Sequence, residues 1–150
     1  MFFEFGPAEP DRHRAPTGHR AGRPTILVVE DEALLALELE QVLTEAGYAV
    51  LLAADGRGAL ARAAEPAGRL RAAVVDLNLP GSMAGREVIR HLRGRNTGLP
   101  VLVVTGYEPL AGQADLRGLG GPTARLQKPW QPERLLQRLR DVITSSDGVA

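Results

Sequence analysis

Short apolar runs alternate with amphipathic stretches along the chain from Thr25 onward. The runs are rich in β-branched residues and show no alternation of polar and apolar side chains, which is typical of strands covered on both faces of a sheet. This pattern predicts five strands, over residues 25–29, 48–53, 72–75, 101–105 and 123–127.

The stretches between these runs carry apolar residues at the spacing of an α-helix. In the first stretch, Leu35, Leu39 and Leu43 recur every four residues and define one apolar face. Residues 108–122 form a poor helix because they hold four glycines and two prolines. The other predicted helices cover residues 32–46 (closed by Gly47), the segment between Asp55 as cap and Pro66, residues 85–93, and the segment from Pro132 with the apolar face Leu135, Leu139, Val142 and Ile143.

The alternation of strands and helices indicates the fold class. Strand starts fall near residues 25, 48, 72, 101 and 123, so the chain repeats a strand–helix unit five times. Units of this kind join through right-handed crossovers, which produce a parallel sheet with helices on both faces. In such α/β sheets the binding site lies beyond the carboxyl ends of the strands.

Composition excludes several function classes. The 150 residues suffice for one domain, and 18 basic against 18 acidic residues leave no net charge to attract nucleic acid or an anionic membrane. The chain has no cysteine, which excludes disulfides, zinc–thiolate sites and thiol nucleophiles. No apolar run approaches the roughly 20 residues that span a bilayer, and the first residues lack the apolar stretch of a signal peptide. A cytoplasmic location is therefore expected.

The composition changes near residue 24. Residues 1–23 hold three prolines, three glycines and no apolar period, together with all three phenylalanines of the chain. Such a segment is typical of a flexible tail. We therefore expect an N-terminal tail over residues 1–23, one domain over residues 24–145 and a short C-terminal tail over residues 146–150.

Polar side chains stand at the ends of four of the five predicted strands. Glu30 and Asp31 come directly after the first strand and Asp76 after the third, while Thr105 ends the fourth and Lys128 follows the fifth. Because the strands are parallel, these side chains meet at one edge of the sheet. Taken singly, each has a plain structural explanation as a turn or capping residue. Acids, a hydroxyl and an amine together at one edge indicate a site.

The acids of this cluster predict a divalent cation. Two carboxylates about 4 Å apart repel each other by about 4 kcal/mol at an effective dielectric constant of about 20, and a bound cation converts this repulsion into binding. Oxygen ligands without histidine or cysteine suit Mg²⁺, with Mn²⁺ as the alternative. Lys128 adds a compact positive charge, and it is the only lysine beside 17 arginines.

Phosphoryl transfer is the chemistry that suits these groups. A carboxylate acts as nucleophile and forms an acyl phosphate, while the other groups position the phosphoryl group and neutralise its charge. Asp76 is the candidate nucleophile, and Lys128 and the Thr105 hydroxyl are candidates for holding phosphoryl oxygens. The candidate metal ligands are Glu30, Asp31, Asp76 and the backbone carbonyl of Asn78.

Four short motifs resemble those of the receiver domain of bacterial response regulators. They are ILVVEDE at residues 26–32, VVDLNLPG at 74–81, VLVVTG at 101–106 and LQKPW at 126–130, in the order and spacing of that family. The resemblance covers about residues 24–145. It implies a flavodoxin-like (βα)5 fold, a three-layer sandwich whose five-stranded parallel sheet has the strand order 2-1-3-4-5.

The same resemblance implies a role in a two-component phosphorelay. Asp76 would accept a phosphoryl group from a sensor histidine kinase or a histidine phosphotransfer protein, with Mg²⁺ required, and the chain would then signal through a changed binding surface. It would catalyse nothing beyond its own phosphorylation and dephosphorylation. Because no output domain follows the last helix, we expect a stand-alone receiver that binds an unidentified protein target, with no nucleic-acid or membrane partner, as a monomer or weak homodimer.

The chain departs from the family pattern at the expected switch. Many receivers have an aromatic residue three positions before the lysine, and here that position is Arg125. Tyr107, which follows Thr105 and Gly106, is the candidate to replace it, in an arrangement that resembles a clade of stand-alone receivers lacking that aromatic. The glycine-rich residues 118–122 predict a mobile fourth helix where the signal could be read out.

Three alternatives share this fold class. A nucleotide or flavin binder needs a glycine- or hydroxyl-rich loop after the first strand, where Glu30 and Asp31 would repel phosphate. An aspartate-nucleophile phosphatase typically carries a second acid two residues after the nucleophile, where this chain has Asn78. A degenerate receiver, acting as an interaction module without phosphorylation, is disfavoured because all the expected site residues are present.

Overall fold

The computed structural model describes residues 22–65, 69–106 and 116–147. Its five strands pair in parallel and form one sheet in the order 2-1-3-4-5, as the resemblance to receiver domains implied. The architecture is therefore a flavodoxin-like α/β fold. The strands are β1 (Thr25–Val29), β2 (Ala49–Ala53), β3 (Leu70–Asp76), β4 (Val101–Thr105) and β5 (Thr123–Gln127).

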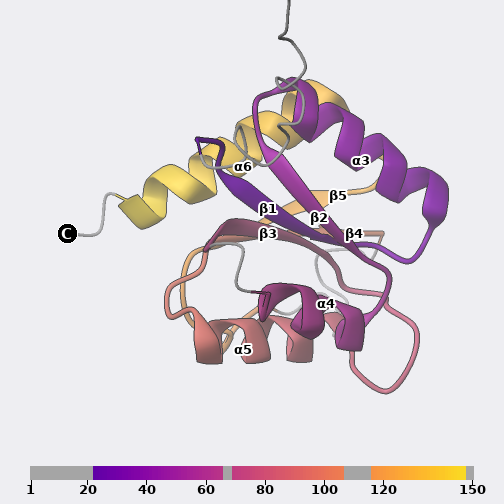
Figure 1. Cartoon of the computed structure of the whole chain (residues 1–150), viewed down its shortest axis with the longest axis vertical. Helices are drawn as coiled ribbons and strands as arrows, with labels where there is room; N and C mark the ends of the chain where they lie inside the picture. The colour runs from indigo at the N-terminus through magenta and orange to yellow at the C-terminus, as the bar shows by residue number, and fades with distance from the viewer. Residues whose placement is uncertain (1–21, 66–68, 107–115, 148–150) are drawn as a thin grey trace, which may run out of the picture.

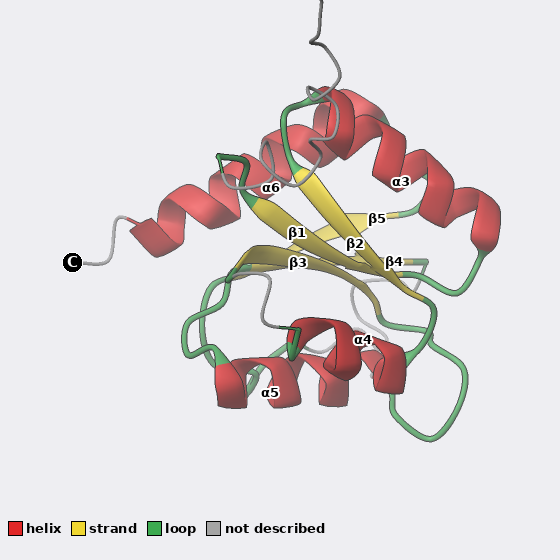
Figure 2. Cartoon of the chain, in the orientation of Figure 1, coloured by secondary structure: helices red, strands yellow, loops and turns green. Residues whose placement is uncertain are grey.

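Helices cover both faces of the sheet. In the described part of the chain they are α3 (Ala33–Glu45), α4 (Gly56–Ala63), α5 (Gly85–Arg95) and α6 (Pro132–Asp147). α3 and α6 lie on one face, and α4 and α5 lie on the other (Figure 1). Figure 2 shows the resulting helix–sheet–helix layers. Among these helices, none has the length and apolar character needed to cross a membrane.

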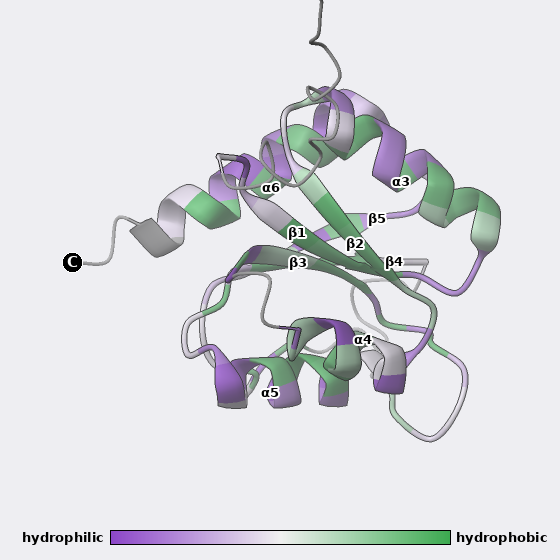
Figure 3. Ribbon diagram, in the orientation of Figure 1, coloured by the Kyte–Doolittle hydropathy of each residue, from purple (hydrophilic) through white to green (hydrophobic). Residues whose placement is uncertain are grey.

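Alternate residues of each central strand face opposite helical layers. In β1, Leu27 and Val29 pack with residues of α4 and α5, whereas Ile26 and Val28 pack with residues of α3 and α6. All four side chains are at most 1% exposed. The hydrophobic colour along the inner strands in Figure 3 follows from this burial on two sides. It explains why the apolar runs lack the polar alternation of a half-exposed strand.

Several element ends differ from the prediction by one or two residues, among them the carboxyl ends of β3 and α5. β3 continues through Asp76, which pairs in register with Val104, so this carboxylate belongs to the strand rather than to the turn after it. α5 continues past Gly94 to Arg95, although the sequence predicted its end at Arg93. The Asn96 N–H donates to the Leu92 carbonyl at 2.9 Å, so the helical hydrogen-bond pattern continues across Gly94 although glycine weakens helices. The buried Arg93 side chain donates hydrogen bonds to three backbone carbonyls outside the helix.

Two predicted helix signals are confirmed. Asp55 Oδ1 accepts a hydrogen bond from the Gly58 N–H at 2.7 Å and caps α4. Gly47 follows α3 with a φ of 102°, a conformation that favours glycine. Pro66 and residues 107–115 lie outside the described residues, and residues 116–122 show turns and bends without helix.

Arg23 fastens the start of the domain to the end of α3. Its guanidinium donates hydrogen bonds to the backbone carbonyls of Thr44, Gly47 and Tyr48, at distances from 3.1 to 3.3 Å. The carbonyls of Gly47 and Tyr48 lie in the turn after α3, and the Thr44 carbonyl also accepts from the Gly47 N–H, so Arg23 ties the start of the domain to the turn that ends α3. Except for Gly22 and Arg23, the predicted tail over residues 1–23 lies outside the described residues.

Candidate functional site

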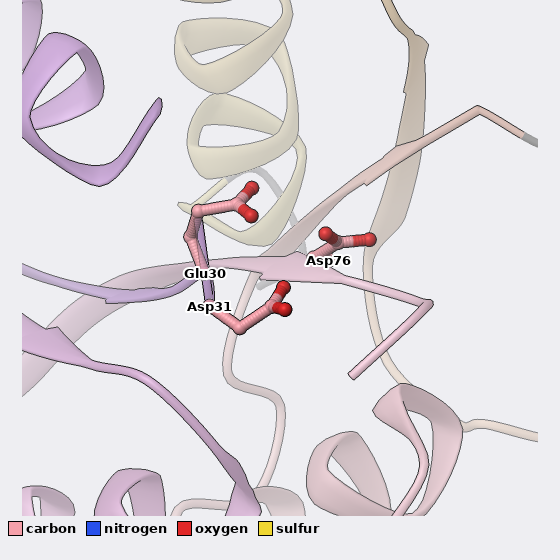
Figure 4. A group of neighbouring side chains, drawn as sticks. All are labelled: Glu30, Asp31 and Asp76. Carbon is pink, nitrogen blue, oxygen red and sulfur yellow. The ribbon is translucent and has the colours of Figure 1, made fainter. Parts of the chain in front are cut away.

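Three carboxylates converge at the carboxyl edge of the sheet. β1 and β3 are parallel neighbours, so the residues at their ends reach the same edge. Glu30 and Asp31 follow β1, and Asp76 is the last residue of β3. One oxygen of each carboxylate lies within 4.8 Å of the others. Figure 4 shows the three side chains directed into one common space.

Two of these acids are buried. Glu30 is 3% and Asp76 4% exposed, while Asp31 faces solvent. Local backbone donors satisfy part of their hydrogen-bonding capacity, because the Glu32 N–H donates to Glu30 Oε2 at 3.1 Å and the Asn78 N–H donates to Asp76 Oδ1 at 2.9 Å. Two buried like charges at this separation still need positive charge nearby.

Lys128 supplies part of that positive charge. Its Nζ donates a hydrogen bond to Asp76 Oδ2 at 3.0 Å and lies 3.5 Å from Glu30 Oε1. The sheet positions it, because β5 pairs with β4 and the Lys128 N–H donates to the Thr105 carbonyl at 2.9 Å just beyond the paired strands. The only lysine of the chain therefore reaches the acids from the edge strand of the sheet.

These contacts shift two pKa values. Burial raises the pKa of Glu30, and the charge of Asp76 adds to the increase against the opposing effects of the Glu32 N–H and Lys128. Burial alone would lower the pKa of Lys128, but its hydrogen bond to Asp76 and the charges of Asp76 and Glu30 outweigh burial, so this pKa is raised. Lys128 is therefore an ammonium at neutral pH, and three carboxylates against one ammonium make the site acidic.

A pocket of about 460 Å³ opens beside the carboxylates. Thr105, which is 1% exposed, ends β4 immediately before Gly106 at the pocket wall. Carboxylate oxygens without histidine or cysteine fit a hard cation such as Mg²⁺, and the ammonium fits an anionic oxygen beside it. The residues that line the pocket are Asp31, Glu32, Asp76, Asn78, Gly106 and Lys128.

Gly85 supports the site and was missed by the sequence analysis. A Cβ at this position would lie 2.6 Å from the Asp76 carbonyl oxygen and 2.7 Å from Leu77 Cα. Both contacts are with backbone, so a side chain here would separate the start of α5 from the end of β3 or displace Asp76. The available signal was a glycine at the first position of the predicted helix, where its conformational freedom disfavours a helix start unless close packing requires it.

Of the three candidate switch residues, the structure places only Thr105 at the site. Arg125 lies within β5 opposite Val103, where its carbonyl accepts two hydrogen bonds from the Arg138 guanidinium, and it is not among the described residues that line the pocket. Tyr107 lies outside the described residues. The coupling of Thr105 to Tyr107 therefore stays a prediction.

Comparison with known families and curated proteins places this site in context. Residues 26–140 match the response regulator receiver domain. The chain is 40% identical over 124 residues to the two-component response regulator PhoP of Pseudomonas aeruginosa, covering 82% of this chain and 53% of that protein. It is 36% identical over 124 residues to the probable transcriptional regulatory protein TcrX of Mycobacterium tuberculosis, covering 81% and 51%. The chain thus spans about half the length of these relatives.

Solved structures show the same fold at somewhat lower identity. The chemotaxis protein CheY4 of Vibrio cholerae is 32% identical with a TM-score of 0.72, and the match covers 80% of this chain and 98% of that one. The receiver domain of a sensor histidine kinase from Pseudomonas aeruginosa is 28% identical with a TM-score of 0.70, covers 81% and 98%, and has a magnesium ion coordinated in its active-site cleft. Together with the match over residues 26–140, these similarities show that the chain belongs to the response regulator receiver domain family.

Proposed function

We propose that this receiver domain accepts a phosphoryl group on Asp76 from the phosphohistidine of a sensor histidine kinase or a histidine phosphotransfer protein. The observation that carries the proposal is the 3.0 Å hydrogen bond from Lys128 Nζ to Asp76 Oδ2 within a cluster of three carboxylates. A lone carboxylate is a poor nucleophile toward an anionic phosphoryl group because the two charges repel. The ammonium and a bound cation offset this repulsion.

The transfer step forms one bond and breaks another. An oxygen of Asp76 attacks phosphorus, and the O–P bond of an acyl phosphate forms while the P–N bond to the donor imidazole breaks. The electron pair of the P–N bond stays with the imidazole, which takes up a proton from solvent. Each Asp76 oxygen accepts one hydrogen bond in the unphosphorylated chain and keeps a further lone pair for the attack.

The other residues of the site bind and position the phosphoryl group. Glu30, Asp31, Asp76 and the Asn78 carbonyl would hold Mg²⁺, which when bound neutralises charge on the phosphoryl oxygens. The Lys128 ammonium exchanges its hydrogen bond with Asp76 for one with a phosphoryl oxygen, and the Thr105 hydroxyl donates to another. Attack of water on the phosphorus later breaks the aspartyl O–P bond, releases inorganic phosphate and restores the aspartate.

The phosphorylated chain would act by binding a protein target in the cytoplasm. We assign the conformational switch to Thr105, Tyr107 and Arg125, since the Thr105 hydroxyl has a new acceptor once phosphate is present. A changed surface on the receiver domain, over residues 24–145, then recognises the target. The downstream target is a protein that binds the phosphorylated and the unphosphorylated chain with different affinity.

Incubation of the purified chain with Mg²⁺ and acetyl phosphate, followed by intact mass measurement, tests the proposal. We expect one phosphoryl adduct on the wild type and on the matched control Asp55→Asn, which changes a surface carboxylate and keeps a good N-cap residue. Asp76→Asn should carry no adduct. Phosphoramidate, whose P–N bond is like that of phosphohistidine, tests the donor class in the same assay.

Other outcomes of this assay would overturn the proposal. A wild type that carries no adduct and leaves the donor intact would indicate an interaction module that works without phosphorylation. Continuous turnover of the donor that requires Asp76 would indicate a phosphatase. An adduct that persists in Asp76→Asn would place the acceptor at another residue.

A further inference from the structure

The two helical layers differ in charge although the whole chain is neutral. α3 contains three glutamates and no lysine or arginine, and Asp31 and Glu32 precede it. α5 contains four arginines and a histidine against one glutamate. Because α3 and α5 lie on opposite faces of the sheet (Figure 1), the molecule has an acidic side and a basic side.

The acidic side also exposes apolar surface. Leu34 and Leu37 of α3 are 82% and 56% exposed, and the first turns of α3 are coloured hydrophobic in Figure 3. At 3.6 residues per turn, these leucines share one face of the helix with Glu38, Gln41 and Glu45, which are also exposed. These five residues, hereafter the α3 stripe, combine an apolar end with an acidic end.

The basic side carries a groove with complementary features. A groove of about 530 Å³ between α4 and α5 is lined by Leu60, Arg90, His91, Gly94 and Arg95, hereafter the α4–α5 groove. Leu60 is half-buried, and the four α5 residues are exposed. Within the described part of the chain, neither the Arg90 nor the Arg95 side chain has a hydrogen bond or ion pair. The groove therefore offers apolar surface beside two free guanidinium groups.

We propose that the chain associates head to tail, with the α3 stripe of one copy bound in the α4–α5 groove of the next. The two leucines would pack against Leu60, and the glutamates of the stripe would pair with Arg90 and Arg95. A second copy is the occupant that the charges favour, because each copy presents both halves of the match. This inference goes beyond the proposed phosphorylation and does not depend on it.

The positions of the two surfaces determine the type of assembly. They lie on opposite faces of the sheet, so one molecule cannot pair its own stripe with its own groove. For the same reason a two-fold dimer cannot use both contacts at once. Each contact therefore leaves a free stripe at one end and a free groove at the other, and the assembly grows with concentration rather than stopping at a dimer. Both surfaces are small, so the contact is weak.

Sedimentation velocity on the full chain tests this assembly. We expect the average mass to rise between about 10 μM and 1 mM, the range of weak contacts. Raising the salt from about 50 to 500 mM should reduce the mass, because exposed charges are screened. A wild type that stays monomeric throughout this range would overturn the proposal.

Two variants, each with one surface altered, sharpen the test. Leu34→Gln/Leu37→Gln removes the apolar end of the stripe, and Arg90→Glu reverses one charge of the groove, so each variant alone should remain monomeric. All three residues are exposed, and circular dichroism confirms that the variants fold. The matched control Arg134→Glu, an exposed arginine on α6 outside the groove, should associate like the wild type.

Mixing the two variants separates this arrangement from a symmetric one. The leucine variant keeps an intact groove and the arginine variant keeps an intact stripe, so an equimolar mixture should form a dimer and nothing larger. Absence of this mixed dimer, or loss of association in Arg134→Glu equal to that in Arg90→Glu, would overturn the proposal. Neither result bears on phosphorylation of Asp76, which the acetyl phosphate assay measures separately.

Discussion

A positively charged side chain lies at each end of the parallel strands, and its partners differ: carboxylates surround it at the carboxyl edge, and neutral carbonyls surround it at the amino edge. At the carboxyl edge, Lys128 lies among carboxylates that outnumber it. At the amino edge, the Arg93 guanidinium donates hydrogen bonds to the carbonyls of Leu99, Leu119 and Pro122, the last two in the segment that leads into β5. Burial lowers the pKa of Arg93 to about 10, so it remains charged at neutral pH.

This difference separates stability from function. The Arg93 contacts join α5 to the segments that enter β4 and β5. The carbonyl acceptors are neutral and satisfied by these bonds, so the amino edge offers no ligands to a metal ion. The carboxyl edge keeps an excess of negative charge, which is unfavourable for the isolated chain and favourable for binding a cation. Changes at the amino edge should therefore lower stability alone, whereas changes at the carboxyl edge should alter ion binding and phosphorylation.

The largest expected effect is at the amino edge. Arg93→Leu removes the guanidinium donor from the carbonyls of the buried residues Leu99 and Leu119, whereas the Pro122 carbonyl keeps its hydrogen bond from the Val101 N–H. Each unsatisfied buried group is costly, so we expect the free energy of unfolding to fall by about 4 kcal/mol. Urea unfolding measures this loss. Arg90→Leu, at an exposed position of the same helix, is the control and should stay within about 0.5 kcal/mol of the wild type. Equal losses in both variants would contradict the structural role of Arg93.

Gly85 packs against the backbone of Asp76, so a substitution there should lower both the stability of the fold and the affinity for Mg²⁺. Gly85→Ala forces a Cβ against the backbone of Asp76 and Leu77, so we expect a loss of about 3 kcal/mol in urea unfolding together with weaker Mg²⁺ binding. Gly94→Ala is the matched control in the same helix, since a Cβ there meets nothing within 4 Å, and it should gain about 0.5–1 kcal/mol. Unchanged Mg²⁺ affinity in Gly85→Ala would show that Asp76 is not displaced.

Local pattern was sufficient to predict the sheet and the meeting of the acids. The apolar runs contain their own signal, because burial on both faces removes polar alternation, and parallel strands bring their ends to one edge. Glu30, Asp31 and Asp76 follow from that rule alone. The position of Lys128 beside Asp76 follows from the same rule and the strand order. The roles of these residues in catalysis and metal binding stay predictions.

Long-range packing was not predictable from the same pattern. Arg93 is one of 17 arginines, and only the path of the segments around Leu99 and Leu119 shows that it is buried. Gly85 looked like an unfavourable helix residue because the close approach of the Asp76 backbone is a tertiary contact. The helical period assigned Leu39 and Leu43 to the core correctly, yet it gave no reason for leucines on the opposite, exposed face of α3.

Mg²⁺ should stabilise the folded chain through the carboxyl edge. An ion that binds only the folded state adds about 1.4 kcal/mol to the free energy of unfolding when its concentration is ten times Kd. Urea unfolding with Mg²⁺ and with a chelator measures this difference. Asp31→Asn should reduce the gain, while Arg93→Lys at the other edge should retain it. A gain of equal size in Asp31→Asn would place the ion elsewhere.

The smallest expected effect is that of Glu30→Gln on stability, and its sign should differ with and without Mg²⁺. Without Mg²⁺ at neutral pH, Glu30→Gln should raise the free energy of unfolding by about 1 kcal/mol, the usual size of a single-residue effect, because it removes a buried charge beside Asp76. The raised pKa of Glu30 means that the folded chain binds a proton more readily than the unfolded chain. The advantage of the variant should therefore shrink as pH falls through the folded pKa, and it should be absent below the unfolded value of about 4.5.

Saturating Mg²⁺ should reverse the order of the two proteins at neutral pH. The wild type gains ion-binding energy through the ionised Glu30 carboxylate, whereas the neutral glutamine is a weaker ligand for a hard cation. Urea unfolding of both proteins, with and without Mg²⁺ at neutral pH and without it near pH 4, gives the full comparison. If Glu30→Gln were less stable than the wild type in the absence of the ion, the ionised Glu30 would stabilise the fold through its pairing with Lys128, and the carboxyl edge would hold no unfavourable excess of negative charge.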